Sequence, residues 1–147
     1  MHFDIITSMF SERLISGSID QENNNFLNKE QQAIEIIGWV QRFVYETSVQ
    51  TKGLSLAARI EQTRQIQKGT CTTKHEFLAH ELTALGHDLI FLTFPFWWQE
   101  LAVDFPQDLQ ELANQMPQQY HLALGLIRGS KVEIIDVTWD PGLKKAS

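Results

Sequence analysis

The sequence predicts an α+β domain in which N-terminal helices pack on a small antiparallel sheet. Up to Leu85, apolar residues recur at the three- and four-residue spacing of amphipathic helices, whereas most later segments alternate with a period of two. A Gly129-Ser130 pair separates two apolar runs near the C-terminus, which is typical of a two-residue hairpin turn. With 147 residues, 43% of them hydrophobic, the chain is long enough for a single domain, 1–147, with its own core.

The helical spacing predicts four helices before the sheet. Their expected bounds are 2–15, 29–48, 54–67 and 71–85. A polar, turn-rich stretch over 17–28 is expected to be a loop between the first two helices. Gly86 should end the fourth helix, because glycine readily adopts the left-handed conformation that closes a helix.

Three strands are expected in the second half of the chain, with a short helix before the last two. The expected strands are 88–94, 121–128 and 132–139, and the helix is 106–116. With the Gly-Ser pair at the centre of the turn, Arg128 faces Lys131. In that register His121 and Asp136 are diagonal neighbours on adjacent strands, and their side chains point to the same face.

Charge and cysteine content limit the classes of function. The net charge is −6 and the basic residues are scattered, which is not the pattern of a nucleic-acid binder. The N-terminus lacks the basic and apolar regions of a signal peptide, and the apolar-looking stretch 89–98 is too short to cross a membrane. A single cysteine excludes an internal disulfide and suits a reducing compartment. We therefore expect a cytoplasmic protein with neither nucleic-acid nor membrane partners, and the oligomeric state stays open.

The single cysteine, Cys71, lies where a polar loop becomes a helix. The free N–H groups and positive dipole end of a helix N-terminus favour an anion and lower the pKa of a thiol. The same N–H groups can stabilise an oxyanion. The alternative is that Cys71 is a small buried apolar residue, as most lone cysteines are.

An imidazole and a carboxylate follow Cys71 along the chain. Asp136 interrupts the apolar run 132–137, and a carboxylate in such a run costs free energy unless it has a partner. His121, on the same predicted face, is a suitable partner. A thiol, an imidazole and a carboxylate can act as nucleophile, base and orienting group. The alternatives are a structural histidine at a strand start and an acid that caps a turn.

Three motifs in this order resemble the transglutaminase-like superfamily, over about residues 66–141. The motifs are Gly69-Thr70-Cys71 before a helix that ends Leu82-Thr83-Ala84-Leu85-Gly86, a strand that begins at His121, and Asp136-Val137-Thr138-Trp139-Asp140. The resemblance implies a papain-like fold, with Cys71 as nucleophile, His121 as base and Asp136 as orienting acid. Two departures leave the substrate class open: His121 precedes Leu122-Ala123 where members often have Ala-Trp, and Val137 replaces the usual proline.

The function implied by this resemblance is cysteine-dependent acyl transfer. A peptide or small acyl substrate would form a thioester with Cys71, which water or an amine would then resolve, without a cofactor. The alternative is a binding or interaction domain that keeps the fold without turnover. The aromatic segment 94–98 could line a substrate cleft or complete the core.

No metal site is expected from the histidines near Cys71. His75 and His80 are five residues apart, whereas the zinc-protease helix motif needs a separation of four. Cys71 and His75 have the right spacing, but third and fourth ligands are missing from the sequence pattern. His75 and His80 are therefore expected at the surface or behind the site.

Overall fold

The computed structural model describes residues 21–100 and 106–139, and the side chains from residue 28 onward within these ranges. Its elements in chain order are α1 (Gln21–Gln41), β1 (Val44–Tyr45), α2 (Leu56–Ile66), β2 (Lys68–Gly69), α3 (Cys71–Ala84), β3 (Leu89–Phe96), the 3₁₀ helix η1 (Trp98–Glu100), α4 (Gln107–Gln115), β4 (Gln119–Arg128) and β5 (Lys131–Ile135). Helices followed by an antiparallel sheet confirm the α+β class. The expected helix over 2–15 lies outside the described residues.

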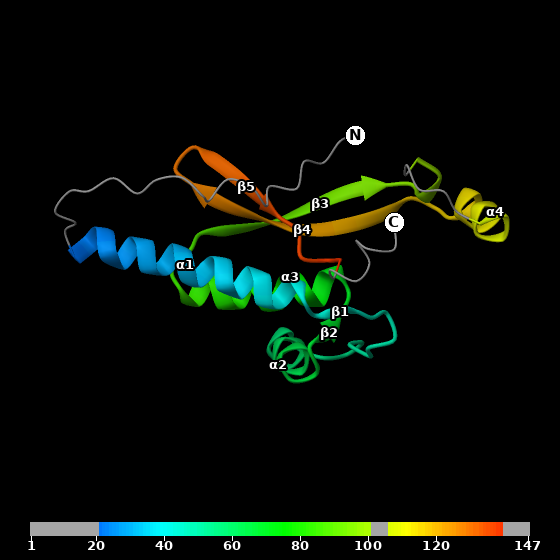
Figure 1. Ribbon diagram of the computed structural model, residues 1–147. Coiled ribbons are helices and arrows are strands. Elements are labelled where there is room, and N and C mark those ends of the chain that lie inside the picture. The colour runs from blue at the N-terminus through cyan, green and yellow to red at the C-terminus, as the bar shows by residue number, and fades with distance from the viewer. Residues whose placement is uncertain (1–20, 101–105, 140–147) are drawn as a thin grey trace.

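Two helices cover one face of the main sheet. Strands β3, β4 and β5 form an antiparallel sheet in that order, and α1 and α3 run side by side beneath it (Figure 1). The side chains that join these layers are almost completely buried: Val40, Phe43, Phe77, Leu78, Leu82, Leu124 and Val137. Each such side chain contributes about 1.5–3 kcal/mol through the hydrophobic effect, so this core fixes α3 against β4.

The predicted hairpin register is confirmed. Arg128 pairs with Lys131 and Leu124 with Ile135. Gly129 has a φ of +60°, and among the described non-glycine residues only Gln67 has a positive φ. A positive φ at Gly129 alone fits the expected type II′ turn. Strand β5 ends at Ile135 rather than at 139, so the chain leaves the sheet there and turns toward the start of α3 (Figure 1).

The N-terminal half differs from the sequence prediction in two places. Helix α1 already begins at Gln21, so the loop prediction over 17–28 is wrong for 21–28, while 17–20 lie outside the described residues. The start of α1 is almost entirely polar, and a helical turn without apolar residues leaves no periodic pattern to detect.

Helix α1 also ends at Gln41 instead of 48, because the chain then enters a short strand. Strand β1 pairs in parallel with β2, as Tyr45 faces Gly69. Two-residue strands are too short to produce a period-two pattern, so the sequence did not predict this pair. Its position matters because β2 leads directly into α3.

The end of α3 is as predicted. Gly86 has a φ of +83°, its N–H donates to the Thr83 carbonyl at 2.9 Å, and the His87 N–H donates to the Leu82 carbonyl at 3.1 Å. These are the two hydrogen bonds of a Schellman motif, which satisfies the last carbonyls of the helix.

Candidate active site

Cys71 is the first residue of α3, and the chain before it is shaped to start a helix there. Thr70 has an extended backbone (φ −83°, ψ 177°), and its N–H donates to Thr73 Oγ1 at 3.0 Å. Gly69 leaves room for this contact, since a Cβ at that position would lie 2.1 Å from Thr73 Oγ1. The thiol of Cys71 is half-buried and stands in the first turn, where N–H groups lack partners within the helix.

The three side chains predicted from the sequence lie together. His121 Nε2 is 2.8 Å from Asp136 Oδ2, and the Cys71 thiol forms a side-chain hydrogen bond with His121. Because Nε2 faces the carboxylate, Nδ1 is the ring nitrogen left for the thiol. The result is a continuous series of hydrogen bonds from sulfur through imidazole to carboxylate.

Thr138 fixes the other oxygen of the carboxylate. Its backbone N–H donates to Asp136 Oδ1 at 2.9 Å, and its hydroxyl lies 3.5 Å from His121 Nε2. Asp136 is therefore held at both oxygens. Its position directly after β5 places it diagonally across from His121, as the register predicted.

The electrostatics of the three groups favour a thiolate beside an imidazolium. The hydrogen bond with Asp136 and then that with Cys71 raise the pKa of His121 to about 9. The hydrogen bond with His121 lowers the pKa of Cys71 and outweighs burial, with a further contribution from the Leu122 backbone. Burial would raise the pKa of Asp136, but hydrogen bonds from His121 and Thr138 hold it at about 2. All three shifts stabilise the charged forms at neutral pH.

Two buried polar side chains lie behind the site. Lys74 and His75 are both 0% exposed: the burial of Lys74 was not predicted, His75 lies behind the site, which is one of its two expected positions, and His80 is exposed. Both follow Cys71 in the second turn of α3. They precede Leu78 by four and three residues, so they lie on the same buried helix face as that leucine. This spacing was the signal in the sequence.

Aromatic side chains flank the thiol and the imidazole. Tyr45 lies beside Gly69 in the β1–β2 pair and packs on Trp139, with ring centroids 4.9 Å apart. Burial, and then the negative charge of Cys71, raise the pKa of the Tyr45 phenol, which keeps it neutral. In the segment 94–98, Phe94 pairs with His121 across β3 and β4. The same segment also packs on itself, since Phe96 and Trp98 make an edge contact at 5.4 Å.

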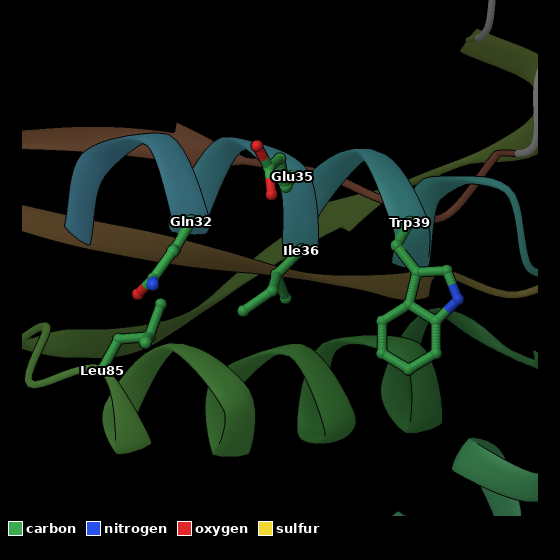
Figure 2. Close-up of a pocket in the computed structure, with 5 residues that line it drawn as sticks. All are labelled: Gln32, Glu35, Ile36, Trp39 and Leu85. Atoms are coloured by element: carbon green, nitrogen blue, oxygen red, sulfur yellow. The ribbon is translucent and has the colours of Figure 1, made fainter. Parts of the chain in front are cut away.

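A shallow groove between α1 and α3 lies away from these residues. It is lined by Gln32, Glu35, Ile36, Trp39 and Leu85, with Trp39 directed from α1 toward α3 (Figure 2). Leu85 follows the last residue of α3, whereas Cys71 is the first, and about 1.5 Å per residue separates them by roughly 20 Å. The groove therefore does not belong to the candidate site.

The described part of the chain holds no cluster of three or more His, Cys, Asp or Glu side chains arranged for a metal ion. Among the same residues, no helix is both long and apolar enough to span a membrane.

Three comparisons were made with known proteins: with models of protein families, with curated proteins and with solved structures. None of them found a match. Inferences about function therefore rest on the geometry of Cys71, His121 and Asp136 and on the sequence motifs that contain them.

Proposed function

We propose that this protein is a cysteine-dependent acyl-transfer enzyme of the transglutaminase-like type, with a papain-like arrangement of helix and sheet. The observation that carries the proposal is the hydrogen-bonded series from Cys71 through His121 to Asp136 at the N-terminus of α3. The order of the three motifs in the sequence and the packing of α3 against β4 support it. A peptide amide or a small ester is the substrate class that this chemistry takes.

In the first half of the reaction, the Cys71 thiolate attacks the carbonyl carbon of the substrate. The carbonyl π electrons move to oxygen, and N–H groups of the first turn of α3 stabilise the oxyanion. When the tetrahedral intermediate collapses, the bond to the leaving amine or alcohol breaks. The His121 imidazolium donates its proton to that leaving group, and a thioester with Cys71 remains.

In the second half, water or an amine attacks the thioester. Neutral His121 accepts the proton of this nucleophile, the bond to sulfur breaks, and the thiolate and imidazolium are restored. Asp136 keeps Nε2 protonated throughout, so that Nδ1 always faces the sulfur. No step requires a cofactor.

The surroundings of the thiol favour an apolar substrate group. Tyr45 and the 42% exposed Trp139 form an aromatic pair near Cys71, and Phe94 lies beside His121 on the neighbouring strand. Such surfaces bind aliphatic or aromatic groups through the hydrophobic effect and exclude water from the oxyanion.

Intact-mass trapping tests the proposal. The purified protein is incubated with activated esters, glutamine-containing peptides and peptide amides, and the mass of each covalent adduct is recorded. We expect an acyl adduct that is lost in Cys71→Ala and that accumulates in His121→Ala only with the most activated esters. Thr83→Ala, an exposed change near the far end of α3, is the matched control and should form the adduct normally.

Adduct formation and thiol reactivity together decide between the proposed enzyme and a non-catalytic binding domain. If no donor gives a Cys71-dependent adduct, and iodoacetamide reacts with the pH dependence of an ordinary thiol, the chain is a non-catalytic binding domain. If no donor gives a Cys71-dependent adduct although the thiol reacts readily below neutral pH, the proposed acyl transfer is refuted and the activated thiol belongs to a non-enzymatic domain.

A further inference from the structure

We propose that Lys74 and His75 are positioning residues that hold Asp136 against His121 from inside the core. The proposal rests on the function proposed above and assigns a role to two buried groups that take no part in its chemical steps. It concerns the segment 136–138, which follows the end of β5. The β4–β5 pairing stops at Ile135, so the sheet does not hold this segment.

His75 joins the nucleophile to the segment that carries the acid. Its Nδ1 is 2.7 Å from the Cys71 carbonyl oxygen, and the Val137 N–H donates to its Nε2 at 3.1 Å. Because the Val137 amide can only donate, Nε2 is the acceptor and Nδ1 carries the proton. His75 is thus a neutral ring with both nitrogens used, and burial, which lowers its pKa, keeps it so.

The ring of His75 also packs next to the carboxylate of Asp136 without forming a hydrogen bond with it. Its Nε2 lies 3.6 Å from Asp136 Oδ1, too far for a hydrogen bond, and the rings of His75 and His121 meet edge to face at 6.5 Å. The ring therefore fills the space behind the carboxylate and leaves both carboxylate oxygens to His121 and Thr138.

Lys74 holds the other end of the same segment. Its Nζ donates to the Thr138 carbonyl at 2.9 Å and to the Phe43 carbonyl at 2.8 Å. A fully buried ammonium is costly unless it is hydrogen-bonded, so these contacts are strongly constrained. Thr138 in turn donates its N–H to Asp136. Lys74 of α3 thus binds the carbonyl oxygen of Thr138, while the N–H of Thr138 orients the carboxylate of Asp136.

Through these contacts a single helix, α3, positions both Cys71 and the segment that carries Asp136. Cys71 stands in the first turn of α3, and Lys74 and His75 reach from the same helix to residues 137 and 138. Displacements of about 1 Å in such an arrangement are enough to reduce catalysis by orders of magnitude. The helix thus fixes the sulfur and the carboxylate relative to each other, although 65 residues of chain separate them.

Two substitutions at position 75 separate this role from simple packing. The side-chain amide of His75→Gln reaches the former position of Nε2, so its oxygen can still accept the Val137 N–H. The shorter side chain of His75→Asn reaches only the former position of Nδ1, so it can donate to the Cys71 carbonyl but leaves the Val137 N–H without its acceptor. We measure the pKa of His121 by NMR titration of its ring in each variant. The expected result is a fall of about 1 in His75→Asn and a value near that of the unmodified protein in His75→Gln. Leu82→Val, equally buried two turns further along α3, should lower stability without moving this pKa.

Equal His121 pKa values in His75→Asn and the unmodified protein would overturn the proposal. If His75→Asn does not fold, the ring of His75 in the unmodified protein gives the answer. It must be the Nδ1–H tautomer at neutral pH, and an Nε2–H ring contradicts the proposal. Both readouts are independent of turnover. A protein without acyl-transfer activity but with the expected His121 shifts would refute the proposed function and leave the positioning role intact.

Discussion

Replacing Asp136 with asparagine tests how the charge state of the site is maintained. In the native site the pKa of His121 is raised to about 9, and the hydrogen bond with Asp136 is the largest cause. A group with that pKa is about 97% protonated at pH 7.5, compared with about 9% for an ordinary histidine of pKa 6.5. The introduced asparagine keeps an acceptor for the Thr138 N–H but removes the negative charge. Because Cys71 still contributes, we expect the pKa of His121 to fall by at least about 1 rather than to return fully to 6.5.

The same substitution should move the proton of the neutral His121 ring from Nε2 to Nδ1. The side-chain amide nitrogen of the introduced asparagine can donate to Nε2, which places the remaining ring proton on Nδ1, facing the sulfur. The ring can then no longer accept the Cys71 proton at Nδ1, so the thiolate–imidazolium pair that attacks the substrate is lost. We expect the rate of Cys71 acylation to fall on the order of 100-fold or more. The pH at which iodoacetamide alkylation reaches half its maximum should move upward, because Cys71 loses part of its imidazolium partner.

The assay combines NMR titration of the histidine rings from pH 5 to 10 with alkylation rates followed by intact mass. Asp88→Asn, an exposed change before β3, is the matched control and should change neither quantity. Titration of His121 near 6.5 in the unmodified protein would refute the electrostatic reasoning. So would an unchanged pKa near 9 in Asp136→Asn, since Asp136 could not then be the main cause.

Two further predictions concern stability. Gly69→Ala should lower the free energy of unfolding by about 1–3 kcal/mol in urea denaturation, because the added Cβ would lie 2.1 Å from Thr73 Oγ1. Gly38→Ala in α1, where the nearest atom is 3.7 Å away, is the control and should be neutral or stabilising, and equal losses in both would contradict the steric argument. Between neutral pH and about 9, the melting temperature of the unmodified protein should fall less steeply than that of Cys71→Ala. The stability that the raised pKa of His121 provides below 6.5 is lost as pH rises toward about 9, but the lowered pKa of Cys71 adds stability as pH rises and partly offsets this loss. In Cys71→Ala that compensation is gone, so stability should fall over this range, and a flat profile would contradict it.

The sequence predicted that His121 and Asp136 lie side by side because local rules determine most of this geometry. The Gly129-Ser130 turn fixes the register of β4 and β5, and a fixed register makes His121 and Asp136 diagonal neighbours without any knowledge of the rest of the fold. The position of Cys71 at a helix start follows similarly from the glycine and threonine before it. Only the approach of α3 to the hairpin depends on long-range packing, which periodicity does not specify.

The sequence did not predict features whose local pattern is compatible with more than one structure. A lysine and a histidine in a helix are usually solvated, and only their spacing from Leu78 shows that they share its buried face. A fully buried lysine needs acceptors, and its acceptors here are backbone carbonyls of Phe43 and Thr138, which no side-chain pattern can indicate. The β1–β2 pair is similar, since two-residue strands are defined by their partners rather than by their own residues. Buried polar groups on an otherwise apolar helix face, immediately after a candidate nucleophile, are therefore the feature to test first, because their burial depends in part on partners distant in sequence, here Phe43, Val137 and Thr138.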